Sequence, residues 1–393
     1  MSMNNKEHNT SNAISLAVNR MPASGIRTFF EFLDQNTDVI SLAVGQPDFM
    51  TPEHISAAAS KSMLSGLTGY TSNYGLIELR EHLSNHLNNL YQIKYNPENE
   101  MLLTSGVSEA LDIAVRAIID PGDEVIVPEP AYVAYKPVIL LAGGSYVAVP
   151  TYIEDDFMVK PELIEQAITS KTKAILLGYP CNPTGGVLSR EKLSEIAKIA
   201  EKHDLIIIAD ELYDRLVYGT DHTCFASLPN MKKRTILLGG FSKSYAMTGW
   251  RLGYIAAEPE ILEAIMKIHQ YVMMSAPTAA QYAGIEAITN GEEDIQMMKQ
   301  EYDKRRTFLM ERLTSLGFQI SEPKGAFYAF PDVHSTTGMD GQEFSNQLLL
   351  KHQVAVVPGE VFGESGKNFV RMCYATSMEE LSEAMNRIEK FIA

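Results

Sequence analysis

Several side chains that could do chemistry follow short, strongly hydrophobic runs in this sequence. Asn182 stands in GYPCNPTGG after the run AILL, Asp210 ends the run LIIIAD, and Lys243 stands in FSKS after TILLGG. An amine, a carboxylate and an amide gathered in one site could bind a carbonyl compound covalently, stabilise charge and move protons. Further aromatic and hydroxyl side chains lie near these positions in the sequence: Tyr132, Tyr213 and Ser242.

Each of these residues also has an ordinary structural interpretation. Asp210 could be a helix N-cap, and the segment from Asn182 to Gly185 is a good turn sequence. A single loop lysine is usually solvated, and a single tyrosine usually belongs to the core. It is their shared position, directly after buried strands, that favours a site over isolated structural roles.

The hydrophobic runs themselves indicate the elements that position these residues. They are rich in β-forming residues and lack polar alternation, as strands buried on both faces do. Helical patterns such as residues 190–203 separate them, so the sequence predicts a mainly parallel sheet covered by helices on both sides. Ligands bind at the carboxyl ends of such strands. The predicted strands are Glu124–Val127, Ser145–Val149, Ala174–Leu177, Leu205–Ala209, Thr235–Leu238 and Leu252–Ala257.

The sequence pattern changes after about residue 290, where a long charged helix leads into a smaller α+β unit with predicted strands at Ala326–Phe330, Val354–Val357 and Phe369–Tyr374. Its closing helix is expected from about Met378 to Ile392, with Ser377 as the N-cap. We therefore expect a two-domain chain with the following parts: a flexible tail (1–13), an N-terminal segment packing with the small domain (14–47), a large domain (48–290) and a small C-terminal domain (291–393).

The composition limits the classes of molecule that this protein could bind. The chain has 33 basic and 49 acidic residues, a formal net charge of −16, which disfavours binding to nucleic acid and to anionic membranes. Its three cysteines show no CxxC spacing, so we expect neither a disulfide framework nor a metal site, and a reducing cytoplasm fits. No apolar run approaches the roughly 20 residues needed to span a bilayer, and the polar start is not a signal peptide.

The segment GGFSKSYAMTGWRLGYIAA resembles the lysine signature of the class I aminotransferases, which belong to the fold-type I pyridoxal-phosphate (PLP) enzymes. The order of further motifs is similar from about Ser24 to the C-terminus: ISLAVGQPDF, YTSNYGLIELR, LLTSGVSEALD, PGDEVIVPEPAYVAY, YPCNPTGG, ADELY, GAFYAFP and FVRMCYATS. The resemblance implies a large PLP-binding domain with a smaller α+β domain. It also implies a homodimer that transfers an α-amino group from an L-amino acid to a 2-oxo acid.

The resemblance also implies roles for the residues that hold the cofactor ring. Lys243 would hold PLP as a Schiff base and would then move the substrate Cα proton. Asp210 would pair with the pyridine nitrogen and favour its protonated form, which stabilises the carbanion. Tyr213 and Asn182 would donate to the cofactor phenolate oxygen, and Tyr132 would stack on the ring.

A phosphate site is expected where TSGVSEALD opens a helix after a glycine turn, because helix N-terminal N–H groups attract anions. The family pattern adds a tyrosine, Tyr70, that reaches the phosphate from the neighbouring subunit. The complete set of expected phosphate contacts within one chain is Gly106, Val107, Ser108, Ser242 and Arg251.

Substrate recognition is expected at Arg371, whose planar fork suits an α-carboxylate, with Gly45 and Asn182 in contact with the same group. Arg116 lies eight residues after Ser108, on roughly the same helix face. It could reach the far carboxylate of an acidic substrate, or it could form a structural salt bridge.

Some alternatives stay open at this stage. PLP-dependent C–S β-lyases share the Lys, Asp and Arg set, so these residues do not separate them from transaminases. A PLP-sensing regulator would need a DNA-binding domain, for which about two dozen residues before the family region are too few. SGIRTFFEF and IHQY resemble the aspartate, N-acetyl-L,L-diaminopimelate and aromatic aminotransferases, but no role follows for His269 or Tyr271.

Overall fold

The computed structural model describes residues 13–19, 21 and 38–393. Its centre is a seven-stranded sheet in the order β2-β8-β7-β6-β5-β3-β4, in which β8 alone runs antiparallel to its neighbours. Because the strands from β4 to β7 are parallel, their carboxyl ends share one edge. The strands are β2 (Met101–Thr104), β3 (Glu124–Glu129), β4 (Ser145–Pro150), β5 (Thr172–Gly178), β6 (Ile206–Asp210), β7 (Thr235–Gly240) and β8 (Gly253–Ala256).

Successive residues of the central strands belong to two different cores. In β5, Ala174 and Leu176 pack into one core, whereas Ile175 and Leu177 pack into the other. Side chains of a strand alternate between the two faces, so a strand with apolar residues at every position must be covered on both sides. This explains why these runs show no polar alternation in the sequence.

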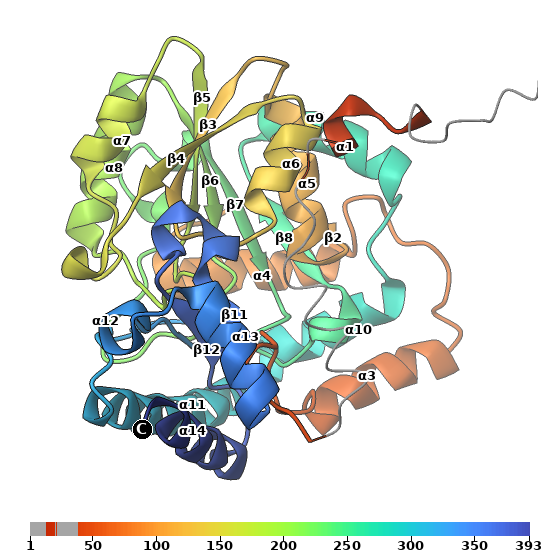
Figure 1. Ribbon diagram of the computed structural model, residues 1–393. Coiled ribbons are helices and arrows are strands. Elements are labelled where there is room, and N and C mark those ends of the chain that lie inside the picture. The colour runs from red at the N-terminus through yellow and green to blue at the C-terminus, as the bar shows by residue number, and fades with distance from the viewer. Residues whose placement is uncertain (1–12, 20, 22–37) are drawn as a thin grey trace, which may run out of the picture.

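Figure 1 shows the sheet between two layers of helices. The core that contains Ala174 and Leu176 is completed by helices α5 (Gly106–Ile118), α6 (Tyr135–Leu141) and α9 (Pro259–Val272). The opposite core is completed by α3 (Glu53–Leu64), α4 (Ile77–Tyr91), α7 (Pro161–Ala167), α8 (Arg190–Lys202) and α10 (Thr278–Asn290). Among the described residues, no helix has both the length and the apolar character to span a membrane.

A second, smaller unit begins with the long helix α11 (Glu292–Ser315). Strands β11 (Val357–Pro358), β12 (Val370–Cys373) and β9 (Tyr328–Ala329) form an antiparallel sheet, and β1 (Ile40–Ser41) pairs with β10 (Val354–Ala355). Segment 40–41 near the N-terminus is thereby joined to the C-terminal part of the chain. The other α-helices in the described part of the chain are α1 (Leu16–Asn19), α12 (His334–Thr337), α13 (Gly341–His352) and α14 (Met378–Ile392).

The α/β fold with its mainly parallel, helix-covered sheet is as the sequence predicts. The six strands predicted for the central sheet are all present, and the Ser377 hydroxyl caps α14 by accepting from the N–H of Glu380. The prediction lacked β2, a four-residue strand at the sheet edge. Most of the expected N-terminal tail (1–12), and residues 20 and 22–37 of the expected segment 14–47, lie outside the described residues.

Candidate active site

The polar residues that follow the buried strands meet in one cavity at the carboxyl edge of the sheet. Asp210 is the last residue of β6, Lys243 comes three residues after β7, and Asn182 comes four residues after β5. The sheet topology therefore brings together side chains that are far apart in the sequence. The predicted site residues that line this cavity are Gly45, Val107, Ser108, Tyr132, Asn182, Asp210, Tyr213, Ser242, Lys243, Arg251 and Arg371.

Lys243 is half-buried, and its amine points toward the N-terminal segment of the chain. The Nζ atom donates a hydrogen bond to the carbonyl oxygen of Gly45 at 2.6 Å. Burial, together with the charges of Arg371 and Arg251, lowers the pKa of Lys243 to about 8. A substantial part of this amine is therefore neutral near pH 8, which is the form that attacks carbonyl carbon and accepts protons.

Asp210 lies on the floor of the cavity, with a partner for each carboxylate oxygen. The Tyr135 hydroxyl donates to one oxygen at 2.9 Å, and the Leu212 N–H donates to the other at 3.3 Å. Burial raises the pKa of Asp210 to about 6, and these two hydrogen bonds limit the rise. The carboxylate is thus ionised at neutral pH in a position where a cationic group would stabilise it further.

The N-terminus of α5 and Arg251 form a second polar part of the cavity. Gly106 has φ = +74°, and a Cβ atom there would lie 2.4 Å from Nη2 of Arg251, so only glycine lets the guanidinium pack on this turn. Nη2 also lies 3.5 Å from the Ser108 hydroxyl oxygen. A guanidinium beside a helix N-terminus is an anion-binding arrangement.

Arg371 lies on β12 with its guanidinium between two aromatic rings. Its Cζ atom is 4.5 Å from the ring centre of Tyr328 and 5.1 Å from that of Phe362. Nη1 donates to Oδ1 of Asn182 at 2.9 Å, whereas Nε is buried without a hydrogen-bond partner among the described residues. The rings fix the plane of the fork, and the unsatisfied Nε can donate to an incoming carboxylate.

Two tyrosines of the site, Tyr135 and Tyr328, were not predicted from the sequence. Tyr135 donates to Asp210, and the Tyr328 hydroxyl lies 2.8 Å from the Tyr213 hydroxyl. A Cβ atom at Gly45 would lie 2.4 Å from the Tyr328 hydroxyl, which explains the glycine there. Tyr135 follows Tyr132 at i+3, a helical spacing that could have indicated a shared face, but Tyr328 carries no comparable signal.

Three predicted site residues do not line the cavity. Gly106 lies directly behind it, against Arg251. Tyr70 is 85% exposed in the loop after α3. Arg116 pairs with Asp112 one turn earlier on α5 at 3.0 Å, with 45% of its side chain exposed. The structure thus favours the salt-bridge interpretation of Arg116 over contact with a substrate carboxylate.

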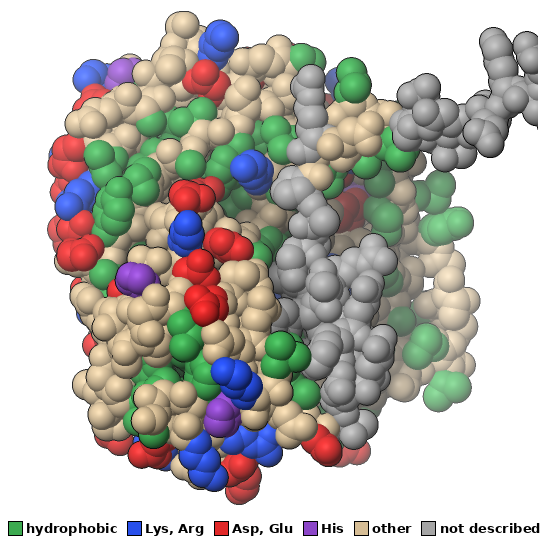
Figure 2. All heavy atoms as spheres, in the orientation of Figure 1, with side chains coloured by type: hydrophobic (Ala, Val, Ile, Leu, Met, Phe, Trp, Pro, Cys, Tyr) green, Lys and Arg blue, Asp and Glu red, His purple; other side chains and the backbone are tan. Residues whose placement is uncertain are grey.

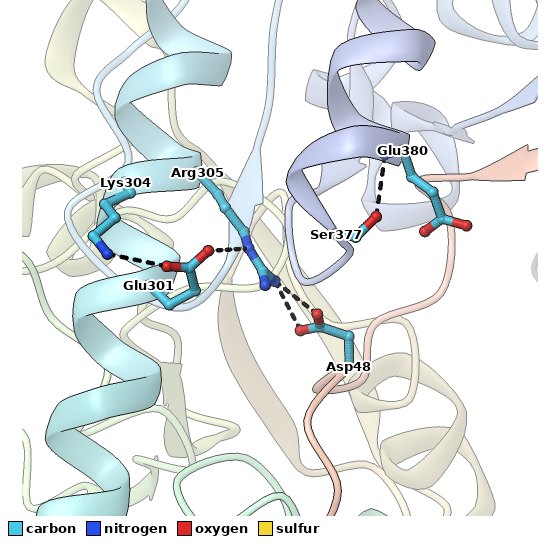
Figure 3. A network of polar contacts seen from close by, with 6 residues as sticks. All are labelled: Asp48, Glu301, Lys304, Arg305, Ser377 and Glu380. Carbon is cyan, nitrogen blue, oxygen red and sulfur yellow. Dashed lines mark hydrogen bonds and ion pairs between the residues drawn. The ribbon is translucent and has the colours of Figure 1, made fainter.

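The segment that carries Gly45 is anchored to the smaller unit by an ion pair. Both carboxylate oxygens of Asp48 accept from Nη1 of Arg305 on α11, at 2.9 and 2.8 Å. Figure 3 shows this pair together with Glu301, whose carboxylate accepts from Nε of Arg305 at 3.2 Å. Gly45 is therefore held three residues from a fixed point on a long helix.

These residues fit pyridoxal phosphate as a set. The cavity offers a buried amine of lowered pKa for an aldehyde, a carboxylate for a pyridine nitrogen, and a guanidinium at a helix N-terminus for a phosphate. Arg371 remains for a carboxylate, since its Nε has no partner among the described residues. An open α/β sheet with this donor set at its carboxyl edge defines a fold-type I PLP-dependent enzyme.

Comparison with known proteins gives the family within that class. The profile of the family "Aminotransferase class I and II" matches residues 37–388. The putative aminotransferase YugH of Bacillus subtilis (strain 168) is 48% identical over 95% of this chain and 97% of its own length. The aspartate aminotransferase of Pyrococcus abyssi is 42% identical, covering 97% of this chain and 98% of that protein.

A solved structure agrees with these relatives. The aromatic aminotransferase from Pyrococcus horikoshii superposes with a TM-score of 0.88 at 42% identity, over 92% of this chain and 98% of that one. The chain belongs to the class I and II aminotransferase family and is a PLP-dependent aminotransferase.

Proposed function

We propose that the cavity holds pyridoxal phosphate with Lys243 as its covalent partner and Asp210 at the pyridine nitrogen. When bound, the cofactor supplies an aldehyde carbon for linkage to an amine and a conjugated ring that takes up the electron pair released at the substrate Cα. Asp210 supports this role because its pKa of about 6 leaves it ionised at neutral pH. The Tyr135 hydroxyl holds the carboxylate in place.

The phosphate would be held by the N-terminus of α5, through Gly106, Val107 and Ser108, and by Arg251, with Ser242 nearby in the cavity wall. Close packing of Arg251 on Gly106 supports this assignment. On the ring, Asn182 has its amide oxygen committed to Arg371, which leaves its NH₂ group free to donate. We assign the second donor to the Tyr213 hydroxyl and the stacked ring to Tyr132.

Lys243 would carry the proton that leaves the substrate Cα. Its lowered pKa of about 8 allows the neutral amine to take a proton from the substrate Cα near physiological pH. Arg371 holds the α-carboxylate so that Cα faces this amine, and the Gly45 backbone closes the site beside it. Burial of these groups excludes water, which strengthens each charge interaction.

The convergence of Lys243, Asp210 and Arg371 on one cavity carries this proposal. Incubation of the holoenzyme with an amino acid alone should convert the cofactor to its amino form without release of ammonia. Ammonia release with each turnover would instead indicate a β-lyase. Borohydride reduction followed by peptide mapping should place the cofactor on Lys243, and a label on another lysine would refute the assignment.

The amino donor is proposed from the relatives, which differ in their names. One is named for aspartate, one solved structure for aromatic amino acids, and a further Bacillus subtilis relative, 42% identical over 94% of this chain and 93% of its own length, is a probable N-acetyl-LL-diaminopimelate aminotransferase. We propose an aspartate-like, aromatic or diaminopimelate-type donor. A panel of these donors against 2-oxoglutarate and pyruvate distinguishes them by kcat/KM.

We further propose a cytoplasmic homodimer in which Tyr70 completes the partner's phosphate site. Tyr70 is 85% exposed, and apolar residues around it, Met63, Leu64 and Leu67, are also exposed. Figure 2 shows exposed hydrophobic side chains along the right-hand edge of the molecule, on the side of α3 and α10. Such a patch supports a subunit interface. The three unpaired, buried cysteines support a reducing compartment.

Mixing two inactive variants tests the shared site. Lys243→Ala lacks the amine, and Tyr70→Ala lacks the proposed contribution to the partner. In a mixed dimer, the intact Lys243 of one chain meets the intact Tyr70 of the other, so activity should return on mixing under subunit exchange. No return of activity, or a monomeric mass at assay concentration, would refute the shared site.

A further inference from the structure

His269 on α9 is completely buried and faces the helix that opens at the cavity. Its Nδ1 atom lies 2.7 Å from Oε1 of Glu109 on α5, and the Glu109 side chain is only 8% exposed. Because an ionised carboxylate can only accept, the imidazole proton in this contact lies on Nδ1. The pair joins two helices, α5 and α9, that pack side by side on the same face of the sheet.

Packing alone does not explain a histidine at this position. The other ring nitrogen, Nε2, is buried and has no hydrogen-bond partner among the described residues. An apolar side chain would fill the same space without the free-energy cost of desolvating an imidazole. The hydrogen bond to Glu109 is therefore the contact that explains a histidine at position 269.

Glu109 also stabilises the backbone turn at the N-terminus of α5. Its second oxygen, Oε2, accepts from the backbone N–H of Ser105, the residue before the helix. Helix N-terminal N–H groups have no partner within the helix, and Glu109 satisfies one of them in the manner of a capping box. Gly106, which follows Ser105, has the positive φ that admits Arg251.

Glu109 is also a negative charge in the first turn of the helix, directly after Ser108. A carboxylate free to turn toward a phosphate would repel it, whereas one that accepts from both Ser105 and His269 is held in the core. Loss of the histidine would release one oxygen of this carboxylate. The structure therefore links His269 to anion binding through the orientation of Glu109.

We propose that His269 is a positioning residue for the cofactor phosphate: it holds Glu109 away from the anion and so keeps the α5 N-terminus open to it. The inference rests on the proposed phosphate site at Val107, Ser108 and Arg251. His269 also accepts, at its backbone oxygen, from the N–H groups of Met273 and Met274.

The test measures binding to the apoenzyme by fluorescence, with pyridoxamine phosphate and phosphate-free pyridoxamine as the two probes. His269→Leu should raise Kd for pyridoxamine phosphate about tenfold, which equals about 1.4 kcal/mol, and should change Kd for pyridoxamine less than twofold. His269→Asn, whose amide can replace the Nδ1 donor, should retain most of the affinity. An equal loss for both probes would mean a general structural role and would overturn the proposal.

A double variant gives the sharper outcome. If the released Glu109 charge causes the loss, His269→Leu combined with Glu109→Gln should recover phosphate affinity. No recovery refutes the proposed route through Glu109. Should His269→Leu fail to fold, His269→Met, which also lacks a donor to Glu109, replaces it in the single and the double variant, with the same expected loss and recovery.

Arg251→Gln separates this inference from the phosphate site on which it rests. If Arg251→Gln leaves the preference for the phosphorylated probe unchanged, the proposed phosphate site itself is wrong. If Arg251→Gln lowers that preference and His269→Leu does not, the site stands and the role of His269 is refuted.

Discussion

Replacing Asp210 with asparagine should stabilise the apoenzyme against unfolding. The same substitution should remove most of the activity of the enzyme with bound cofactor. The wild-type carboxyl is buried, and folding raises its pKa from 3.8 to about 6. Each pKa unit corresponds to about 1.4 kcal/mol, so the buried charge costs roughly 3 kcal/mol of folding free energy at neutral pH. Asparagine removes this cost, because its amide can accept from the Leu212 N–H and donate to the Tyr135 hydroxyl.

The stability difference between Asp210→Asn and the wild type depends on pH, and its sign follows from the raised pKa of Asp210. Between about pH 4 and pH 6 the folded state binds more protons at Asp210 than the unfolded state does, so wild-type stability rises as the pH falls through this window. The advantage of Asp210→Asn should therefore be full above about pH 6 and should disappear toward pH 4. Urea unfolding of both apoenzymes, at equal protein concentration and at several pH values, measures it.

In the enzyme with bound cofactor, Asp210→Asn should lower the reaction rate. An uncharged amide cannot hold the pyridine nitrogen in its protonated form, so the rate of the half-reaction with an amino acid should fall by a factor of 100 or more, about 2.7 kcal/mol. Tyr135→Phe is the matched control, because it keeps the charge but removes its hydrogen bond, and should destabilise the apoenzyme at pH 7.5. An Asp210→Asn apoenzyme less stable than wild type at pH 7.5 would refute the reasoning.

Four further outcomes follow from the contacts of the site. In the apoenzyme, the reaction of Lys243 with an amine reagent should titrate near pH 8, and inorganic phosphate should move this titration to higher pH; a titration near pH 10 would contradict the burial argument. Arg371→Lys should lower kcat/KM for amino acids by about 10- to 100-fold, because an ammonium cannot form the bidentate contact. Asp48→Ala should destabilise the protein by roughly 1–3 kcal/mol in urea unfolding, because it leaves Arg305 partly unpaired, whereas Lys304→Ala, on the exposed side of Glu301, should have little effect. Arg116→Ala should change kcat/KM for aspartate and for a neutral amino acid equally, and a selective loss for aspartate would restore the distal-carboxylate interpretation.

The sequence predicts best those site residues whose positions follow from the direction and the burial of the strands that precede them. Asp210, Lys243 and Asn182 follow strands whose apolar runs identify them, and parallel strands end at the same edge. Arg116 shows the limit of such reasoning. Eight residues along a helix return to nearly the same face but move about 12 Å along the axis, so Arg116 lies far from the helix N-terminus where Ser108 meets the cavity.

Other features depend on contacts between elements that no local pattern encodes. Tyr328 reaches Tyr213 only because β9 pairs with β12, a pairing between short strands of the smaller unit. The His269–Glu109 pair likewise requires α9 to pack on α5, and a sequence separation of 160 gives no periodic signal. β2 is buried at all four positions, but its apolar run is only three residues long (Met101–Leu103) and is too short to stand out in the sequence.

Although the protein as a whole is acidic, residues that line the cavity provide local positive charge for anion binding. The net charge is −16, yet the described residues that line the cavity include three basic side chains, Lys243, Arg251 and Arg371, and one carboxylate, Asp210. Burial and, after it, the charges of the two arginines lower the pKa of Lys243, and each arginine is proposed to hold an anion. A bound phosphate or α-carboxylate cancels part of that positive field, so anion binding makes the lysine more basic. The two arginines therefore enlarge the neutral fraction of Lys243 before ligands bind, and the anions proposed to bind them would make the amine a stronger base once the substrate is in place.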